Sequence, residues 1–514
     1  MRQLKMPSRT ISAVLSLALV ALVAAGAIAL ARSASSRAGG SASPTARASG
    51  TVTFGAGTVG RPIPSGFVGL TTEYRGLEAY AGNNPAALDP VFEQLIRNLA
   101  PGQSPIFRIG GNSTDWTWIP VPHMTPPGGV KYSLNKTWLQ VAAALTKNLG
   151  ARLILGINFE ADSGRVAAAE GQGLIRGIGS GHVAALELGN EPELYAAFPW
   201  YRLPDGRHVR GRPRSYSYAD FVHDFSSISA GIPRSTKLAG PSMGSSLWIP
   251  LLGQFLTGNR RVGLATLHRY PLKHCSPTAR VTIPEILSDT SSTGLAATVA
   301  GAAATSHAHG VPLRIDEMSA ISCGGVAGVS HSFATALWSL DALFAMARVG
   351  VDGVNLQTAP GSFNELFGIT QGRSGWQAAV YPAYYGLMMF VQSAPPGSRL
   401  LRLSGTPGAG VKVWATRATD GSVRVVLIND STSHASTVTV RAPSPSGTAT
   451  LERLQAISAS ATQGVTLNGQ SFGQETGTGL LAGPSGLTYV KPAAAGYAVT
   501  LPAASAALLS LPAK

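Results

Sequence analysis

The chain has 514 residues, which is enough for one large domain and a smaller one. Only 13% of the residues are charged, while glycine and alanine are abundant; this composition excludes an intrinsically disordered chain and suits close packing of helices on a sheet. The formal net charge of +15 predicts a surface that attracts polyanions, such as an acidic polysaccharide, a nucleic acid or an anionic membrane.

The N-terminal segment has the pattern of an export signal. An unbroken apolar run extends from Ile11 to Ala31, and three basic residues precede it, Arg2, Lys5 and Arg9. Residues 1–32 are therefore predicted to be a signal peptide or, if they are retained, a single membrane anchor. Two A-x-A triplets, at 27–29 and 29–31, favour cleavage. Residues 33–50 are rich in Ser, Ala and Gly and predict a flexible linker, so we expect a secreted protein, or one anchored outside the membrane.

Residues 63–393 alternate strand-like and helix-like runs. Before them, within residues 51–62, TVTF from Thr51 predicts a short strand that is expected to pair with the C-terminal β domain. We count eight βα units, whose strands begin near Phe67, Ile106, Arg152, Val183, Lys237, Val262, Pro312 and Val351. Amphipathic helices lie between them, for example from Leu88, Thr137, Tyr218 and Phe333, and a last helix begins at Tyr381.

This alternation predicts an α/β fold, a (β/α)8 TIM barrel. A doubly wound open sheet is the rival, but it would rarely have eight parallel strands that nearly all end in polar residues. After Ser393 the pattern changes to short alternating runs separated by Gly, Pro and Ser clusters, with runs at Val411, Val423, Ser436 and Tyr497. Residues 394–514 therefore predict a C-terminal antiparallel β-sandwich domain.

Two glutamates end strands that should face each other across the barrel mouth. Glu191 follows the fourth strand in LELGNEPEL, and Glu317 ends the seventh in RIDEM. A single glutamate in such a place is more often a helix cap or half of an ion pair. Two of them, three βα units apart, fit a retaining glycosidase, whose acid/base and nucleophile carboxyl groups lie about 5 to 5.5 Å apart.

The polar residues at the other strand ends predict a sugar pocket, because ring hydroxyls need both donors and acceptors. Tyr270, beside the seventh strand, could donate its hydroxyl to Glu317 and favour the ionised nucleophile. Glu191 must start protonated. Asp316 adjoins Glu317, but strand alternation points it to the other side, so we interpret it as structural. The rest of the pocket inventory is Glu73, Tyr74, Arg108, Asn112, Asp115, Glu160, Asn190, Ser242, His268 and Gln357.

The loop from Phe198 to Tyr218 carries five arginines against one acid, Asp205. It follows the strand that bears Glu191, and arginine forks pair well with carboxylate or sulfate, so we infer an acidic glycan as ligand. A merely solvated basic loop is the alternative, and we expect no nucleic acid partner. The arginines are Arg202, Arg207, Arg210, Arg212 and Arg214.

The chain has only two cysteines, Cys275 and Cys323. On the barrel prediction they lie just past the neighbouring sixth and seventh strands, and export would permit a disulfide. The alternative is two unpaired buried residues. With His274 as their only adjacent ligand they make a weak zinc site, so we expect no metal and no cofactor.

Several motifs together resemble glycoside hydrolase family 79, the β-glucuronidase and heparanase-like enzymes. They are FVGLTTEY, RIGGNSTDW, LELGNEPELY, LHRYPL, RIDEMSA and YPAYYGLMMF, with GVTLNGQSF and ASAALLSL in the last domain. The resemblance covers nearly the whole chain after the linker. Asn-Glu-Pro alone is shared by many barrel families, whereas its combination with RIGGN and this C-terminal ending is more specific.

The resemblance implies roles for individual residues. Glu191 is implied as acid/base and Glu317 as nucleophile, with Tyr270 as the donor to that nucleophile. Asn190 is implied as the partner of the sugar 2-hydroxyl, and Glu73 and Asp115 as ligands of other ring hydroxyls. Bacterial members hold the uronate carboxylate with a backbone amide and tyrosines; here Gly324 could supply the amide, whereas Ser322 and Phe363 stand where tyrosines are expected.

The function predicted from the sequence is an exported retaining β-glycosidase, foremost a β-glucuronidase that acts on uronic-acid glycosides or acidic glycans. Two alternatives remain. One is an exo-β-glycosidase for a neutral or methylated sugar, and the other is a surface-tethered glycan-binding protein. We make no prediction of the oligomeric state.

Overall fold

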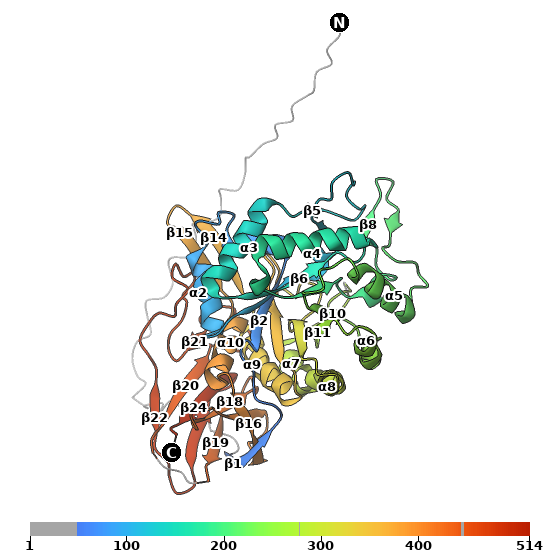
Figure 1. The fold of residues 1–514 in the computed structure, drawn as a ribbon. Helices are drawn as coiled ribbons and strands as arrows, with labels where there is room; N and C mark the ends of the chain where they lie inside the picture. Colours follow the sequence, from blue (N-terminus) through green and yellow to red (C-terminus); the bar gives the residue numbers. More distant parts are fainter. Residues whose placement is uncertain (1–48, 277, 444–446, 514) are drawn as a thin grey trace, which may run out of the picture. The chain divides into compact units, whose positions relative to one another are not determined.

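The computed structural model describes residues 49–276, 278–443 and 447–513 (Figure 1). The predicted export signal and nearly all of the predicted linker lie outside these residues. Among the described residues no helix combines the length and the apolar character needed to cross a membrane.

Eight parallel strands close into a barrel, which confirms the predicted (β/α)8 architecture and excludes the open sheet (Figure 1). Their sequences are near-continuous apolar runs because strands covered by helices are buried on both faces. The last strand pairs with the first, Val354 opposite Val68, and the fourth pairs with the fifth. The strands are β2 (Val68–Glu73), β3 (Ile106–Gly110), β6 (Arg152–Ile157), β7 (Val183–Leu188), β10 (Leu238–Met243), β11 (Val262–Arg269), β12 (Leu313–Met318) and β13 (Gly353–Gln357).

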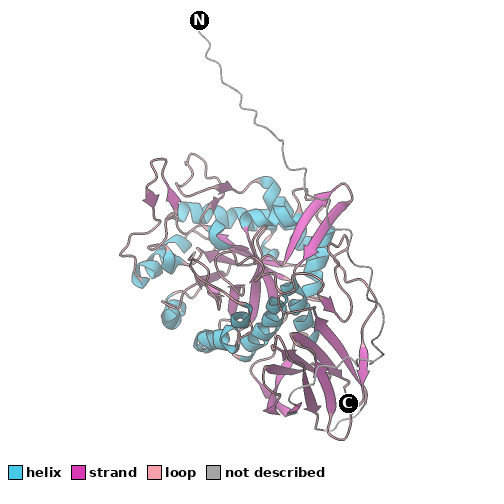
Figure 2. Cartoon of the chain, turned by 180° about the vertical axis from the view of Figure 1, so that it is seen from behind, coloured by secondary structure: helices cyan, strands magenta, loops and turns pink. Residues whose placement is uncertain are grey.

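Helices cover the outside of the barrel (Figure 2). Polar side chains cap several of them. The side chain of Asn135, for example, accepts a hydrogen bond from the Trp138 N–H at the start of α3. The principal helices are α2 (Pro90–Leu99), α3 (Lys136–Leu149), α4 (Gly164–Ile178), α5 (Tyr218–Ser229), α6 (Leu252–Gly258), α8 (Thr293–Ala308), α9 (Phe333–Arg348) and α10 (Pro382–Ser393).

Two features of the barrel region differ from the sequence prediction. Tyr74, predicted as the end of the first strand, begins helix α1 (Tyr74–Ala81). An unpredicted hairpin, β14 (Phe367–Gly372) with β15 (Gly375–Val380), precedes α10. Helix α9 is buried from Phe333 to Ala347, which explains its uninterrupted apolar sequence.

Ten further strands form one sheet that encloses a second core. Strand β1 lies between β16, which it pairs antiparallel, and β19, which it pairs parallel. The predicted sandwich is therefore antiparallel except between β1 and β19. These two strands can be parallel because the whole barrel lies between them in the sequence, so no hairpin joins them. The strands are β1 (Ser49–Val59), β16 (Arg399–Thr406), β17 (Val411–Arg417), β18 (Val423–Asn429), β19 (Ser436–Arg441), β20 (Ala449–Gln455), β21 (Thr466–Leu467), β22 (Thr488–Val490), β23 (Tyr497–Leu501) and β24 (Ser505–Leu511).

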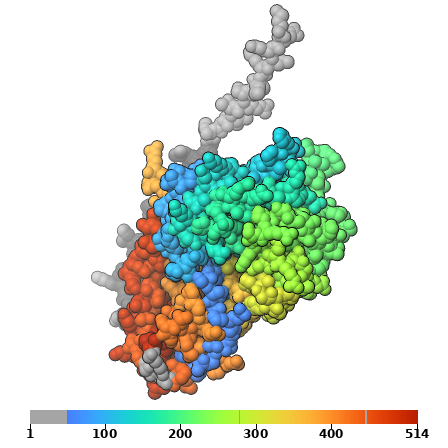
Figure 3. Space-filling model, viewed as in Figure 1, coloured from blue at the N-terminus to red at the C-terminus, as the bar shows by residue number. Residues whose placement is uncertain are grey.

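Side chains of β17 join this sheet to the barrel helices. Lys412 Nζ lies 2.8 Å from Asp341 Oδ2 on α9 and 3.0 Å from Asp430 Oδ2. Trp414 donates its indole N–H to Asp341 Oδ1 at 2.7 Å and stacks on Phe344. In the space-filling view the blue N-terminal strand lies against the orange strands that follow the barrel (Figure 3).

Cys275 and Cys323 form a disulfide that links the loops after β11 and β12, with their Cα atoms 5.3 Å apart. Of the two alternatives, the structure shows the bridge. We expect the double variant Cys275→Ser/Cys323→Ser to lower the free energy of unfolding by up to about 4 kcal/mol, because the bridge closes a long loop in the unfolded chain. Urea unfolding with and without reductant measures this. Equal midpoints for reduced and oxidised wild type would contradict it.

Candidate active site

Glu191 follows β7 on a sharp turn at the carboxyl end of the barrel. Its backbone adopts a left-handed conformation with φ of 53°, and its N–H donates to the Ser242 carbonyl at 2.9 Å. Pro192 then opens a short helical turn. This turn presents the carboxyl group toward β11, where His268 Nδ1 lies 3.0 Å from Glu191 Oε1.

Glu317 ends β12 and approaches Glu191. Carboxylate oxygens of the two residues and a ring nitrogen of His268 lie within 4.8 Å of one another. Tyr270 donates its hydroxyl to Glu317 Oε1 at 2.6 Å, and Arg108 donates to Oε2 at 2.8 Å. Burial raises the pKa of Glu317, but the positive charges of His268 and Arg108 and these hydrogen bonds lower it below its ordinary value. Glu317 is therefore ionised and fixed at both oxygens.

Asp316, which strand alternation places away from the pocket, is in fact inside the barrel. A register shift makes His268 pair with Glu317 directly after Leu267 pairs with Ile315, so Asp316 is an extra residue in β12. Such a bulge turns two consecutive side chains to the same side. Asp316 is fully buried and lies 3.2 Å from Arg108 Nε. The expectation that it faces the other side was wrong for this reason.

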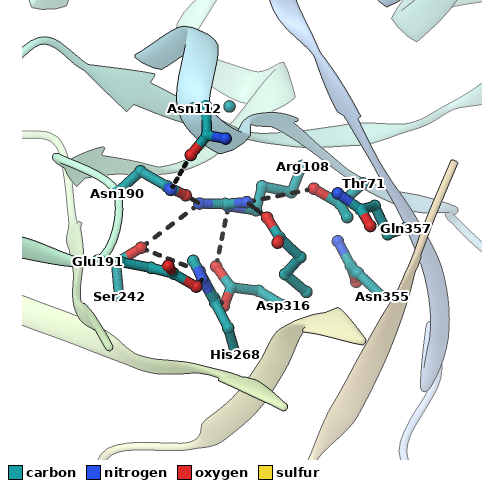
Figure 4. A network of polar contacts seen from close by, with 12 residues as sticks. Thr71, Arg108, Asn112, Asn190, Glu191, Ser242, His268, Asp316, Asn355 and Gln357 are labelled. Atoms are coloured by element: carbon teal, nitrogen blue, oxygen red, sulfur yellow. Dashed lines mark hydrogen bonds and ion pairs between the residues drawn. The ribbon is translucent and has the colours of Figure 1, made fainter. Parts of the chain in front are cut away.

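Arg108, on β3, holds the centre of the site together (Figure 4). Its guanidinium is fully buried and donates to Glu187 Oε2 at 2.6 Å, to Glu317, and to Asn190 Oδ1 at 2.8 Å. Burial lowers the pKa of Arg108, but the charges of Glu187 and Glu317 raise it well above its ordinary value. A rigid planar fork is the cation best suited to several acceptors at once.

Glu187 and Asp316 form a buried carboxyl pair beneath the two candidate catalytic glutamates. Burial and the charge of Glu187 raise the pKa of Asp316 well above its usual range. Burial also raises the pKa of Glu187, but Arg108 and the hydrogen bond with Asp316 bring it below its ordinary value. If both groups were ionised, Glu187 Oε1 and both Asp316 oxygens would be buried without a hydrogen-bond donor. One shared proton, carried by Asp316, removes the repulsion between two buried charges and gives the two carboxyl groups a hydrogen bond to each other.

His268 connects this pair to Glu191. Its Nε2 lies 3.1 Å from Ser242 Oγ and 3.6 Å from Asp316 Oδ1 (Figure 4). Burial lowers the pKa of His268, but the charge of Glu317 and the hydrogen bond to Glu191 raise it to about 9. At neutral pH both ring nitrogens therefore carry protons and donate.

A pH-dependent stability follows from His268. Because its pKa in the folded protein exceeds the ordinary value of 6.5, its stabilisation is complete below pH 6.5 and is lost as the pH rises toward 9. The groups that face it are Glu191, Asp316, Glu317 and Arg108. We expect wild type to lose on the order of 3 kcal/mol more unfolding free energy than His268→Gln between these pH values. Urea unfolding at a series of pH values measures this difference. The exposed His434→Gln variant is the control and should show the pH dependence of wild type. If the stability of His268→Gln had the same pH dependence as wild type, the pKa assignment would be contradicted.

Among the predicted ligands of the sugar, Asn190 and Glu73 lie near the two glutamates. Asn190 Nδ2 donates to Asn112 Oδ1 at 3.3 Å, and its Oδ1 accepts from Arg108 (Figure 4). Glu73 precedes α1, and its Oε2 accepts from the Ser113 N–H at 2.7 Å. Burial raises the pKa of Glu73 despite this hydrogen bond, and nearby Glu317 raises it further.

Asp115 lies beneath the pocket, and protein groups engage both of its oxygens. Oδ1 accepts from the backbone N–H groups of Phe159 and Glu160, and Oδ2 accepts from the Tyr195 hydroxyl at 2.6 Å. Tyr195 in turn accepts from the Asn190 N–H at 3.0 Å. In this structure Asp115 therefore supports Asn190 through Tyr195.

Gly324 lies in the exposed loop after β12, next to the disulfide. Its φ of 83° is in the left-handed region, and nothing lies within 4 Å of the place a Cβ would take. The Gly324 carbonyl accepts from the Phe363 N–H at 3.0 Å, which ties this loop to the one after β13. No described residue accepts a hydrogen bond from the Gly324 N–H.

Two of the five arginines in the loop from Phe198 to Tyr218 are already engaged by other residues of the protein. Arg212 is buried, donates to Asp224 Oδ2 at 2.8 Å and to the Phe159 carbonyl, and lies over the Phe159 ring. Arg207 pairs with Asp205. The other three arginines of the loop, Arg202, Arg210 and Arg214, have no ion pair among the described residues, and Arg202 and Arg214 are exposed.

Three residues of the site were missed from the sequence. Glu187 had a signal, since an acid inside the apolar strand VAALEL needs a buried partner. Glu193 and Gly244, which lie beside Glu191, had none that one sequence shows.

Two sets of side chains have the spacing of a metal site: Glu191, His268 and Glu317, and the deeper Glu187, His268 and Asp316. Both share His268, whose two nitrogens carry protons at neutral pH. Arg108 already places a cation against Glu187, Asp316 and Glu317. The residues present fit this internal cation better than a metal ion.

Comparison with known proteins adds a family and a fold. Residues 413–508 match the model of the glycosyl hydrolase family 79 C-terminal beta domain. A β-glucuronidase from Aspergillus niger is 24% identical over 516 residues, an alignment that covers 88% of this chain and 91% of that protein.

Solved structures share the architecture. A 4-O-α-L-rhamnosyl-β-D-glucuronidase from Fusarium oxysporum 12S superposes with a TM-score of 0.70 at 19% identity, covering 89% of this chain and all of the other. A GH51 arabinofuranosidase from Xanthomonas axonopodis pv. citri gives 0.64 at 16% identity, covering 90% and all of the other. These likenesses show that barrel and β domain occur together in glycosidases.

Proposed function

Because the chain belongs to glycoside hydrolase family 79, and is thus a glycoside hydrolase, we propose that it hydrolyses β-glucuronides with retention at the anomeric carbon. The observation that carries the mechanism is the approach of a Glu191 oxygen and a Glu317 oxygen to within 4.8 Å. This is closer than the separation of about 6.5–9.5 Å that an inverting pair needs for its water, and it supports a retaining pair. The similarity to the Aspergillus niger β-glucuronidase supports the sugar.

In the first step Glu317, ionised and held by Tyr270 and Arg108, attacks the anomeric carbon while the bond to the leaving oxygen breaks. Glu191 gives its proton to that oxygen. In the second step Glu191 takes a proton from water, the water oxygen attacks the anomeric carbon, and the Glu317 carboxylate is released. His268 donates to Glu191 Oε1, so the other oxygen, Oε2, is the one available for this proton.

The substrate side of the proposal rests on the remaining predicted ligands. Asn190, fixed by Arg108 and Asn112, offers its amide to the 2-hydroxyl, and Glu73 offers its carboxyl group to another ring hydroxyl. Gly324 offers its N–H to the uronate carboxylate. For an acidic glycan, the three available arginines after β7 supply counter-charges.

The N-terminal sequence supports export, since residues 1–32 carry a basic start and a long apolar run. We place the enzyme outside the cytoplasmic membrane, either released or held by this segment. N-terminal sequencing of the mature protein tests which form is produced.

The test is hydrolysis of 4-nitrophenyl β-D-glucuronide beside the matching glucoside and xyloside, with the first-formed sugar observed by NMR. We expect turnover of the glucuronide and the β-anomer as first product. Preference for a neutral glycoside would overturn the substrate, and an α-anomer would overturn the retaining mechanism. Binding without turnover would favour a glycan-binding protein. The paired glutamates and the family both favour an enzyme instead.

A further inference from the structure

The segment after β10 passes directly over the carboxyl group of Glu191. A Cβ placed on Gly244 would lie 2.8 Å from Glu191 Cγ and closer still to Cδ and Oε1, which no real Cβ contact tolerates. Its backbone φ is outside the left-handed region, so the conformation does not require glycine. What requires glycine here is the space that the Glu191 carboxyl group occupies.

Hydrogen bonds fix this segment on both sides. Glu193 Oε1 accepts from the Ser245 N–H at 2.5 Å, and Arg269 Nη1 donates to the Gly244 carbonyl at 3.2 Å. Glu193 and Arg269 are both more than nine-tenths buried. Since Ser242 O also accepts from the Glu191 N–H, neither the segment nor the Glu191 backbone can retreat.

The one group free to move is the Glu191 side chain itself. Moving its carboxyl group away from a methyl group on residue 244 would cost little folding energy, because it is the end of a flexible chain. It would, however, break the 3.0 Å contact with His268 and move the proton donor away from the leaving oxygen.

We propose that Gly244 is a positioning residue for the general acid, and that Glu193 holds it in place by its bond to Ser245. This rests on the proposed function, in which Glu191 protonates the leaving group. Acid catalysis matters most when the leaving group is a poor one, so a displaced Glu191 has a kinetic signature that a damaged sugar pocket lacks.

The experiment compares wild type and Gly244→Ala on aryl β-glucuronides whose phenols differ in acidity. We expect kcat/KM to fall about 100-fold or more for phenyl β-glucuronide. For the 2,4-dinitrophenyl substrate, whose leaving group needs no proton, kcat/KM should change little. Azide should raise kcat on that substrate and yield the β-glucuronosyl azide, since it attacks the anomeric carbon of the Glu317 ester without base catalysis. The melting temperature should stay near that of wild type.

Matched controls separate the contact from a general effect. Gly301→Ala adds a methyl group where nothing lies within 4 Å. This variant should behave as wild type. Glu193→Ala should show the same dependence on the leaving group as Gly244→Ala. Glu193→Gln, whose amide oxygen can still accept from Ser245, should keep wild-type activity. These two variants test the proposal even if Gly244→Ala does not fold.

Wild-type activity of Gly244→Ala on the phenyl substrate, or an equal loss on every leaving group, would overturn the proposal. So would Glu193→Ala with an unchanged leaving-group dependence. Failure of the proposed function looks different: wild type itself would not turn over any of the glucuronides.

Discussion

Glu317→Ala is expected to lower kcat on an aryl β-glucuronide by at least about 10⁴-fold, the scale on which loss of a nucleophile acts in other hydrolases. Glu317 is the carboxylate that the surrounding residues keep ionised, through Arg108 on one oxygen and Tyr270 on the other. No other described carboxylate has this pair of donors beside Glu191. Steady-state kinetics measure the loss, with melting temperature as a check on folding.

Azide distinguishes loss of the nucleophile from loss of the fold. In Glu317→Ala, azide can enter the space of the missing carboxylate and displace an activated leaving group directly, which gives the α-glucuronosyl azide. The exposed Glu475→Ala variant is the matched control and should keep wild-type activity. Full activity in Glu317→Ala would remove the nucleophile assignment.

Arg108→Met is expected to have the largest effect on stability. It leaves Glu187 and Glu317 buried and charged without their cation, and breaking one such pair costs about 3–5 kcal/mol. Because a single guanidinium serves both acids and Asn190, we expect the variant to lose at least that much, or to fail to fold. Arg108→Lys keeps the charge but not the fork, so it should fold with lowered stability and low kcat. Urea unfolding measures both.

Asp316→Asn supplies the control for the shared proton. If Asp316 is the neutral member of the pair, its amide replacement changes no charge and should cost less than about 1 kcal/mol while Arg108→Met costs several. A loss as large as that of Arg108→Met would show that Asp316 is ionised and would contradict the proton assignment.

The barrel was predictable because its strands are long apolar runs that end in polar residues, such as RLILGI before Asn158 and VAALEL before Asn190. Helix α9 was equally clear from its length. The β14–β15 hairpin was not predicted, since its two short strands mix glycine, polar and apolar residues without the regular alternation expected of a strand with one buried face. For β1 the sequence predicted pairing with the C-terminal domain but not with which strands. Pairing between strands so far apart in the sequence leaves no local pattern.

At the site, the two glutamates and Tyr270 could be identified because they end strands that a barrel brings together. The bulge that turns Asp316 inward depends on local backbone register, which a single sequence does not reveal. Burial was the other obstacle. Arg212 and Asp115, predicted as ligands for a glycan, also bind backbone groups beneath the surface, and a single sequence does not show this second set of partners.

The place of β1 in its sheet affects how the chain can be cut and how it folds. The ribosome synthesises β1 before the barrel, whereas its neighbours β16 and β19 are synthesised only after the entire barrel. A fragment that begins at residue 394 would lack the strand between them and expose two open edges, which invite aggregation. The first and last parts of this polypeptide are thus a single folding unit, completed only at the end of synthesis.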